Sequence, residues 1–144
     1  MLLGYDCIAY ADGTVIIMSP ITVLHGESKK AYISPTCDTT VQGILKYNDD
    51  IWTPIDFLNS HLILPNGDCL KCGEGAMGNE GFVSCEDASG KLKWSFFCTA
   101  FNPFKKLDLL TPDTIQLSST NEYTMVMDIN QPWKITSINN SWWK

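Results

Sequence analysis

Four cysteines in the middle of the chain have the type and spacing that most favour chemistry. Cys69 and Cys72 are separated by two residues and followed by a glycine, and Cys85 and Cys98 follow at intervals of thirteen. A Cys-X-X-Cys-Gly run is typical of one half of a structural zinc site. The spacing therefore raises four alternatives: a zinc site, a redox pair, a disulfide framework or a set of buried thiols.

Strand geometry argues against a shared ion. The Asn-Gly dipeptide just before this run predicts a two-residue hairpin turn, which places Cys69 opposite Leu64 and Cys72 opposite His61. Because side chains alternate along a strand, Cys69 and Cys72 are expected on opposite faces. We therefore predict no cofactor. A zinc ion, if one binds, would use Cys69 and Cys72 in a strand that is broken at the glycine.

The two later cysteines are expected to lie apart as well. A turn at residues 89–90 places Cys85 opposite Trp94 and Cys98 opposite Gly81, roughly 13 Å along the strands from Cys85. Such a pair cannot hold one ion while the hairpin stays regular. Since free cysteine is among the most buried residue types, the sequence favours thiols that are buried or half-buried in the core.

The predicted pairing of Cys72 with His61 is the one arrangement suited to nucleophilic chemistry, because an imidazole lowers the pKa of a neighbouring thiol. The chain has two histidines, and no third orienting group is evident. The sequence also lacks a P-loop, a dinucleotide fingerprint, and HExxH, GxSxG and EF-hand patterns. We therefore expect no catalytic residues. A small zinc- or thiol-dependent enzyme or metal protein centred on Cys69, Cys72 and His61 is kept as an alternative.

Turn signals flanked by β-prone residues recur along the whole chain, at 12–13, 48–49, 66–67, 89–90 and 130–132. Five hairpins predict a mainly β protein, with an antiparallel sheet or meander of about eight to ten strands that forms a sandwich or half-barrel. Two-residue turns at the first two positions would place Cys7 opposite Met18 and Leu45 opposite Trp52.

Helix signals are sparse. The best segment is TPIDFLNS at residues 53–60, where Thr53 would cap the helix and Pro54 would take its first position. We expect one or two short helices in a single β-rich domain, residues 1–144, because the chain has 144 residues, of which 44% are hydrophobic and 18% charged.

The first ten residues, MLLGYDCIAY, lack a basic region before the apolar run, and Asp6 interrupts that run. This pattern predicts neither a secretory leader nor a membrane span, so we expect a cytoplasmic protein with reduced thiols and no membrane partner. The lysine- and asparagine-rich usage favours a bacterial or mobile genetic source.

The charge favours a basic partner. The formal net charge is −6, and all ten basic residues are lysines. Such a field repels nucleic acid, and arginine, the residue best suited to binding phosphate through two hydrogen bonds, is absent. Nucleic-acid binding is therefore not expected, whereas a basic protein fits the charge.

The residues predicted to contact the partner are acids at two turns and aromatic residues near the last strand. Acids at predicted turns are usually solvated, but acids gathered at one end of a sheet would make a negative surface. An exposed tryptophan is a frequent interface anchor. The candidate partner-binding residues are Asp49, Asp50, Glu86, Asp87, Trp142 and Trp143.

Size, charge and missing motifs together predict a small acidic binding protein that neutralises a basic protein partner. The specific form that we favour is an immunity protein that blocks the basic domain of a secreted toxin, as a monomer or weak homo-oligomer. Two alternatives remain: the zinc- or thiol-dependent protein described above, and a structural subunit of a phage or secretion assembly that uses edge strands to oligomerise.

Overall fold

The structure is a computed structural model that describes residues 2–25, 28–48, 50–75, 80–99, 103–120 and 123–140. This part of the chain forms thirteen strands and one short helix. Their bounds are β1 Leu2–Leu3, β2 Cys7–Tyr10, β3 Thr14–His25, β4 Ser28–Thr40, α1 Val41–Leu45, β5 Trp52–Thr53, β6 Ile55–Ile63, β7 Cys69–Gly75, β8 Gly81–Glu86, β9 Leu92–Cys98, β10 Phe104–Thr111, β11 Thr114–Ser119, β12 Tyr123–Asp128 and β13 Ile135–Asn140.

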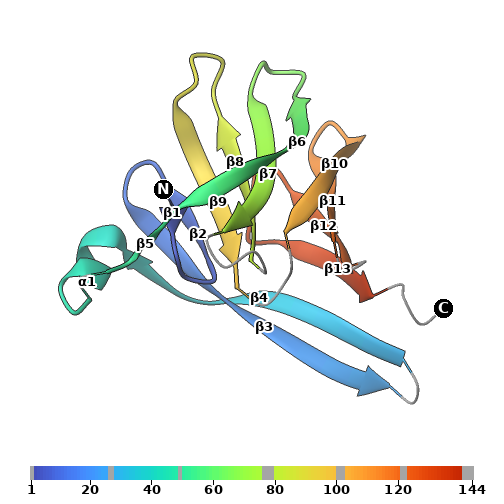
Figure 1. Cartoon of the computed structure of the whole chain (residues 1–144), viewed down its shortest axis with the longest axis horizontal. Coiled ribbons are helices and arrows are strands. Elements are labelled where there is room, and N and C mark those ends of the chain that lie inside the picture. Colours follow the sequence, from blue (N-terminus) through green and yellow to red (C-terminus); the bar gives the residue numbers. More distant parts are fainter. Residues whose placement is uncertain are drawn as a thin grey trace.

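Eleven of the strands form one antiparallel sheet in the order β10-β11-β12-β13-β4-β3-β2-β9-β8-β7-β6, and β1 pairs separately with β5. The junction between β13 and β4 is thin, because it rests on the single pair Asn139 and Lys30. The sheet curls until β10, at one end of the order, packs against β6 and β7 at the other (Figure 1). No strand pairing in the described part of the chain closes it into a barrel.

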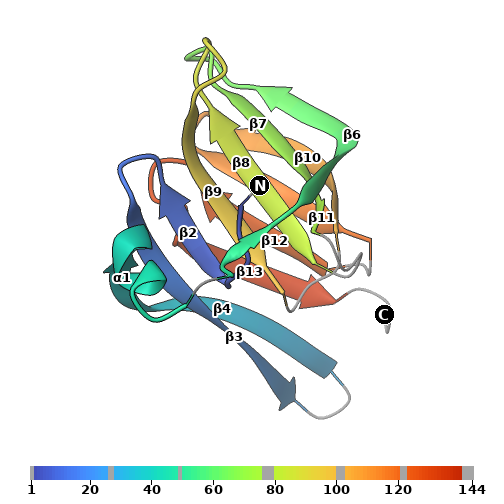
Figure 2. The same ribbon diagram turned by 60° about the vertical axis from the view of Figure 1, so that its left-hand side comes forward.

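The main core lies between the two halves of this curled sheet (Figure 2). Strands β11 and β12 contribute alternate residues to it, such as Leu117 and Met125, and turn the residues between them outward. Strands β8 and β9 contribute Val83, Cys85 and Phe96 from the opposite side. This alternation is what an antiparallel strand with one buried face produces.

A second apolar layer covers the other face of β8, β9 and β2, which we call the outer face. There Phe82 and Phe97 are buried against Leu2 of β1, and Cys7 is buried against Leu3 and the Ile51 side chain that precedes β5. The short elements β1, α1 and β5 therefore act as a partial cover. Because of it, β8 and β9 are buried on both faces.

The structure confirms a mainly β, antiparallel protein with one short helix. The described strands exceed the expected eight to ten, because β1, β4, β10 and β11 were not predicted. Strand β4 pairs with β3 along its whole length, and β10 and β11 are joined by a turn at Pro112 and Asp113.

The helix and the second hairpin were predicted wrongly. Residues 55–63 form β6, and the helix lies earlier, at Val41–Leu45, where the Thr40 side chain accepts a hydrogen bond from the Gly43 amide at 2.9 Å. Trp52 pairs with Leu3 and not with Leu45. In residues 55–63, pairing with β7 prevails over the weak local preference for a helix. The described residues include no helix long and apolar enough to cross a membrane.

Three hairpins close through three-residue turns that end in glycine. The amides of Gly13, Gly67 and Gly90 donate to the carbonyl three residues earlier, at 3.0, 2.9 and 2.9 Å, and their φ angles are 93°, 90° and 87°. A type I turn followed by a left-handed residue produces this closure, and glycine adopts that conformation without strain. The three turn positions are confirmed, but each loop is one residue longer than expected.

The extra loop residue shifts the register. Cys7 pairs with Ile17 rather than Met18, and His61 pairs with Lys71 rather than Cys72. In a strand, a one-residue shift exchanges the two faces relative to the partner.

The third hairpin keeps its predicted pairs in spite of the longer loop. A bulge between Cys85 and Glu86 compensates for the extra residue, so Cys85 still faces Trp94, and Cys98 still faces Gly81. The turn expected at residues 130–132 lies between β12 and β13 and is confirmed.

Candidate functional site

The cysteines are distributed over the core and the surface. Cys69 is partly exposed, while Cys72 is fully buried, so the two point to opposite faces of β7 as predicted. A regular β7 therefore does not present them to one ion. Among the residues that the structure describes, no group of three or more histidine, cysteine or acidic side chains is arranged to hold a metal.

The predicted contact between Cys72 and His61 is wrong. Cys72 packs in the main core and pairs with Val83 on β8, whereas His61 is exposed and pairs with Lys71. The three-residue turn at 65–67 causes this difference. The imidazole is thus on the opposite face from the thiol and is not placed to accept its proton.

Two buried thiols are poor nucleophiles. Burial, with a further contribution from Asp6, raises the pKa of Cys7 to about 12. Burial also raises the pKa of Cys85 to about 11, helped by the neighbouring Asp68. Both side chains stay protonated at neutral pH, and the thiolate is the reactive form.

Beside Cys85, a polar cluster closes one end of the core. Asp68 is buried, and its Oδ2 accepts hydrogen bonds from Lys93 Nζ at 2.6 Å and from Asn66 Nδ2 at 3.1 Å. The hydrogen bond from Lys93 satisfies a carboxylate that burial would otherwise destabilise. The Lys93 side chain is 48% exposed, so the ion pair joins the buried Asp68 carboxylate to a cation at the surface. We assign this cluster a structural role.

Turns from both halves of the sheet meet at one end of the molecule, which we call the turn end. The Ala11 amide donates to the Lys93 carbonyl at 3.0 Å, which joins the β2–β3 turn to the start of β9, next to the β8–β9 turn. A hollow lined by Asn66, Asp113 and Asn130 joins the β6–β7, β10–β11 and β12–β13 turns. The β6–β7 and β8–β9 turns stand at the top of Figure 1.

Most acids of the turn end also hold their own turns. Asp87 Oδ1 accepts from the Ser89 and Lys91 amides at 2.9 and 3.0 Å, and Asp128 Oδ1 accepts from the Asn130 amide at 2.8 Å. Hydrogen bonds of this kind explain why aspartate is frequent in turns. The acids of the turn end are Asp12, Asp68, Glu86, Asp87, Asp113 and Asp128.

Three of the predicted partner-binding residues lie in the described part of the chain, on two separate segments. Glu86 and Asp87 lie at the turn end, where Glu86 pairs with Lys71 at 3.1 Å. Asp50 is exposed in the segment between α1 and β5, away from those turns in the chain. The remaining three candidates, Asp49, Trp142 and Trp143, lie outside the described residues.

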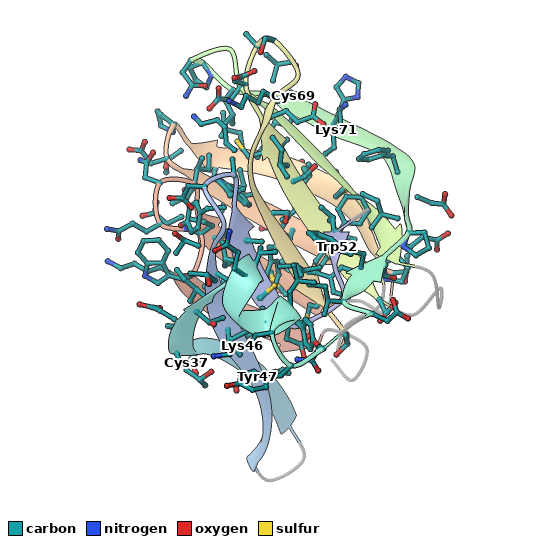
Figure 3. All side chains as sticks on the ribbon, turned by 90° about the vertical axis from the view of Figure 1, so that its left-hand side faces the viewer. Cys37, Lys46, Tyr47, Trp52, Cys69 and Lys71 are labelled. Atoms are coloured by element: carbon teal, nitrogen blue, oxygen red, sulfur yellow. The ribbon has the colours of Figure 1, made fainter. Side chains whose placement is uncertain are left out.

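A row of exposed apolar side chains follows the outer face. Trp52, Phe57, Ile63 and Leu92 are 43%, 52%, 61% and 36% exposed. Figure 3 shows Trp52 on the side of the molecule that carries α1, between Tyr47 and Lys71. Several large apolar side chains on one face are more informative than the same residues scattered singly. This face is therefore a candidate interface.

Part of this face is hollowed. Leu2, Leu3, Ala9, Tyr10, Val41, Trp52, Leu92 and Ser95 line an apolar hollow of ≈ 100 Å³. Its floor is a row of small residues, because Ala9 and Ser95 pair directly across β2 and β9, and Ser84 pairs with Ser95 from β8. The Ser84 hydroxyl is buried and has no hydrogen-bond partner among the residues that the structure describes.

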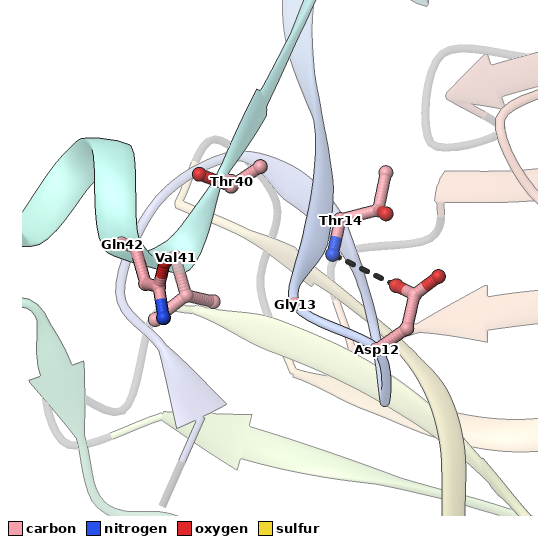
Figure 4. A pocket seen from close by; sticks show the side chains of 6 residues that line it. All are labelled: Asp12, Gly13, Thr14, Thr40, Val41 and Gln42. Carbon is pink, nitrogen blue, oxygen red and sulfur yellow. Dashed lines mark hydrogen bonds between the residues drawn. The ribbon is translucent and has the colours of Figure 1, made fainter.

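A polar hollow adjoins the apolar one. Asp12, Gly13, Thr14, Thr40, Val41 and Gln42 line a space of ≈ 180 Å³ between the β2–β3 turn and the start of α1 (Figure 4). Val41 lines both hollows. We therefore treat them as one two-part groove, with an apolar half under Trp52 and a polar half at Asp12.

Asp12 gives the polar half its charge. Its Oδ1 accepts a hydrogen bond from the Thr14 amide at 2.9 Å, and this bond is the main reason that the pKa of Asp12 is lowered. The carboxylate also raises the pKa of Tyr10, second to burial, and the Tyr10 side chain packs against the main core. At neutral pH the polar half thus holds an anion.

The sequence did not predict that Asp12 and Trp52 belong to a binding groove. Asp12 was recognised only as a turn former, and Trp52 only as a strand residue in a hairpin that does not exist. The adjacent pair Ile51 and Trp52 carries a weak signal, since one side chain must face away from the core on a strand. The distance in sequence between Asp12, Val41 and Trp52 hides the groove.

The chain was compared with protein-family models and with curated proteins. Neither comparison finds a match. The functional inference therefore rests on the two-part groove, the apolar outer face and the charges around them.

Proposed function

We propose that this protein is a small acidic binding protein that recognises a basic surface of another protein. The observation that carries the proposal is the exposed apolar row of the outer face, which ends beside a turn end rich in carboxylates. Apolar anchors with an acidic rim are suited to a partner whose contact surface is basic. The net charge of −6 adds long-range attraction to such a partner.

The specific form of the proposal is an immunity protein that blocks the cationic surface of a toxin domain, in a bacterial cytoplasm. Three features support a binding role over catalysis. The buried thiols Cys7 and Cys85 have raised pKa values, His61 lies away from Cys72, and the two hollows are far smaller than the roughly 300–1,000 Å³ of a typical small-molecule site.

The first experiment co-expresses the chain with the proteins encoded next to it and analyses the purified material by native mass spectrometry without chelator. The expected result is a complex with a basic neighbour and no metal. One equivalent of zinc without a partner would favour the metal-protein alternative. A homo-oligomer that grows with concentration would favour the structural-subunit alternative instead.

The second experiment tests the charge directly on that complex. The double variant Asp50→Lys, Asp87→Lys should lower the association rate constant about tenfold at low salt, and much less at high salt. A matched double variant, Asp56→Lys, Asp108→Lys, changes the net charge equally at exposed or half-exposed positions elsewhere. Equal association rates for the two double variants would remove Asp50 and Asp87 from the interface.

A further inference from the structure

We propose that the two-part groove holds one long cationic side chain, a lysine or an arginine, of the partner protein. Its aliphatic stem lies in the apolar half, and its charge lies at Asp12. The inference rests on the proposed function, because it names the group on the basic partner that the acidic protein recognises.

The apolar half suits an aliphatic stem. Trp52 and Leu92, which line the apolar half, are 43% and 36% exposed. Ala9 also lines it, and its small side chain leaves room for a ligand. Lysine and arginine bury their methylene groups along such surfaces while the charged end stays in water. A tryptophan ring also attracts a cation that lies over its face.

The polar half supplies the opposite charge. Asp12 is ionised at neutral pH, because the Thr14 amide lowers the pKa of its carboxyl group. The described ion pairs join Lys71 to Glu86, Lys93 to Asp68 and Lys106 to Asp108, so none of them neutralises Asp12. The carboxylate is exposed and available to a cation from outside.

Three lysines on elements around the groove are engaged elsewhere. Lys93 donates to Asp68, and the charge of Lys91 lies close enough to lower the pKa of Asp87, where it adds to the larger effect of the hydrogen bonds that this carboxylate accepts. Lys46 lies over the ring of Tyr47, 5.6 Å from its centroid. These three lysines therefore leave the Asp12 carboxylate to a cation from outside.

The two halves are arranged in the order that such a side chain requires. Val41 borders both hollows, so this side chain links the apolar half to the polar half. Figure 4 shows Val41 and Gln42 facing the β2–β3 turn across the polar half. A neutral apolar side chain would leave the carboxylate unmatched, and an acidic one would be repelled.

The test uses the whole protein and small probes, and it reads amide and indole signals by NMR. N-acetyl-arginine amide and N-acetyl-lysine amide are titrated first. N-acetyl-citrulline amide keeps the arginine shape without charge, and N-acetyl-norleucine amide keeps the stem alone. Both cationic probes should shift the amides of Gly13, Thr14 and Val41 and the indole N–H of Trp52. The two neutral probes should bind at least about threefold more weakly.

Variants then separate the two halves. Asp12→Asn should reduce the affinity for the cationic probes about three- to tenfold and leave the neutral probes unchanged. Leu92→Ala and Trp52→Ala should weaken all four probes. Asp56→Asn and Leu110→Ala are matched controls at exposed positions outside the groove and should change nothing. Two apolar variants are used so that one remains if the other unfolds.

Three results would overturn the proposal that the groove binds a cationic side chain. These are no shift of the NMR signals with either cationic probe at about 50 mM, binding of the norleucine probe as tight as that of the cationic probes, or an unchanged affinity of the cationic probes for the Asp12→Asn variant. Failure of the proposed function gives a different result, since no basic partner would then associate at all. A basic partner whose affinity survives both Asp12→Asn and Leu92→Ala would retain the proposed function and exclude the groove.

Discussion

Two hairpins of the same sheet, β8–β9 and β11–β12, have different surroundings. In β11 and β12 partly buried and buried residues alternate, so Gln116 and Ser118 lie between the buried Ile115, Leu117 and Ser119. In β8 and β9 five consecutive residues of each strand are buried. The β8–β9 hairpin therefore has an apolar layer on each side, and the β11–β12 hairpin on one side only.

The difference shows where a binding surface can arise in this fold. On β11–β12 the outward side chains are polar or small and need no cover. On β8–β9 the outward side chains Phe82 and Phe97 are large and are covered by β1, β5 and α1. The cover is incomplete, and the two-part groove and the exposed apolar row lie at its edge.

Truncating an aromatic ring on each side of β9 tests whether the outer layer is packed as tightly as the core. Phe96→Ala on the inner face and Phe97→Ala on the outer face should each lower the free energy of unfolding by about 3–5 kcal/mol, because both rings are fully buried. Urea denaturation measures this, with Gln116→Ala on β11 as a control expected within about 0.5 kcal/mol of wild type. A cost for Phe97→Ala below half that of Phe96→Ala would mean a loose cover.

Thiol labelling compares the stability of the two layers locally. The exposed Cys37 should be alkylated first, and the buried Cys7 and Cys85 at least about a hundredfold more slowly. Cys7 should react before Cys85, because only short elements cover it. Mass spectrometry of labelled peptides measures the order. Alkylation of Cys7 and Cys85 as rapid as that of Cys37 would contradict their burial in the core.

The buried Ser84 hydroxyl predicts a change of the opposite sign. Removing an unpartnered hydroxyl from the interior should raise the free energy of unfolding by up to about 1 kcal/mol, so Ser84→Ala is expected to stabilise the protein. Ser118→Ala, on the open face of β11, serves as the control and should have little effect. A loss of about 1 kcal/mol or more in Ser84→Ala would show that this hydroxyl bonds to something in solution.

The β8–β9 turn predicts a small effect of pH. The Ser89 hydroxyl and the Lys91 amide lower the pKa of Asp87 below its usual 3.8. A lowered folded-state pKa adds stability above pH 3.8, and this stability is lost as the pH falls through the folded-state value. The difference in urea midpoint between wild type and Asp87→Ala should therefore shrink in acid. Ser89→Ala should reduce the pH dependence, and an unchanged difference at pH 2 would contradict the assignment.

The sequence predicted the hairpins better than it predicted the site. Gly13, Gly67 and Gly90 marked three turns correctly, because a turn is a local property that glycine signals. The predicted registers of the β2–β3 and β6–β7 hairpins were wrong by one residue, since a two-residue and a three-residue turn share the same glycine signal. That single residue removed the predicted contact between Cys72 and His61.

The site itself was hidden because its parts are far apart in the chain. Asp12, Val41 and Trp52 belong to a turn, a helix and a separate short strand, and only the folding of α1 and β5 over β2 and β9 brings them together. The apolar run in β9, WSFFC, did carry a local signal. A strand that is apolar without alternation is expected to be buried on both faces.

The sequence by itself determined the antiparallel β class, the positions of four turns, the burial of most cysteines and the negative charge, because these follow from local preferences and composition. The tertiary structure decided the register, the cover over the outer face and the groove at its edge. These depend on contacts between distant segments, and a shift of one residue in a turn or a strand changes which side chains meet.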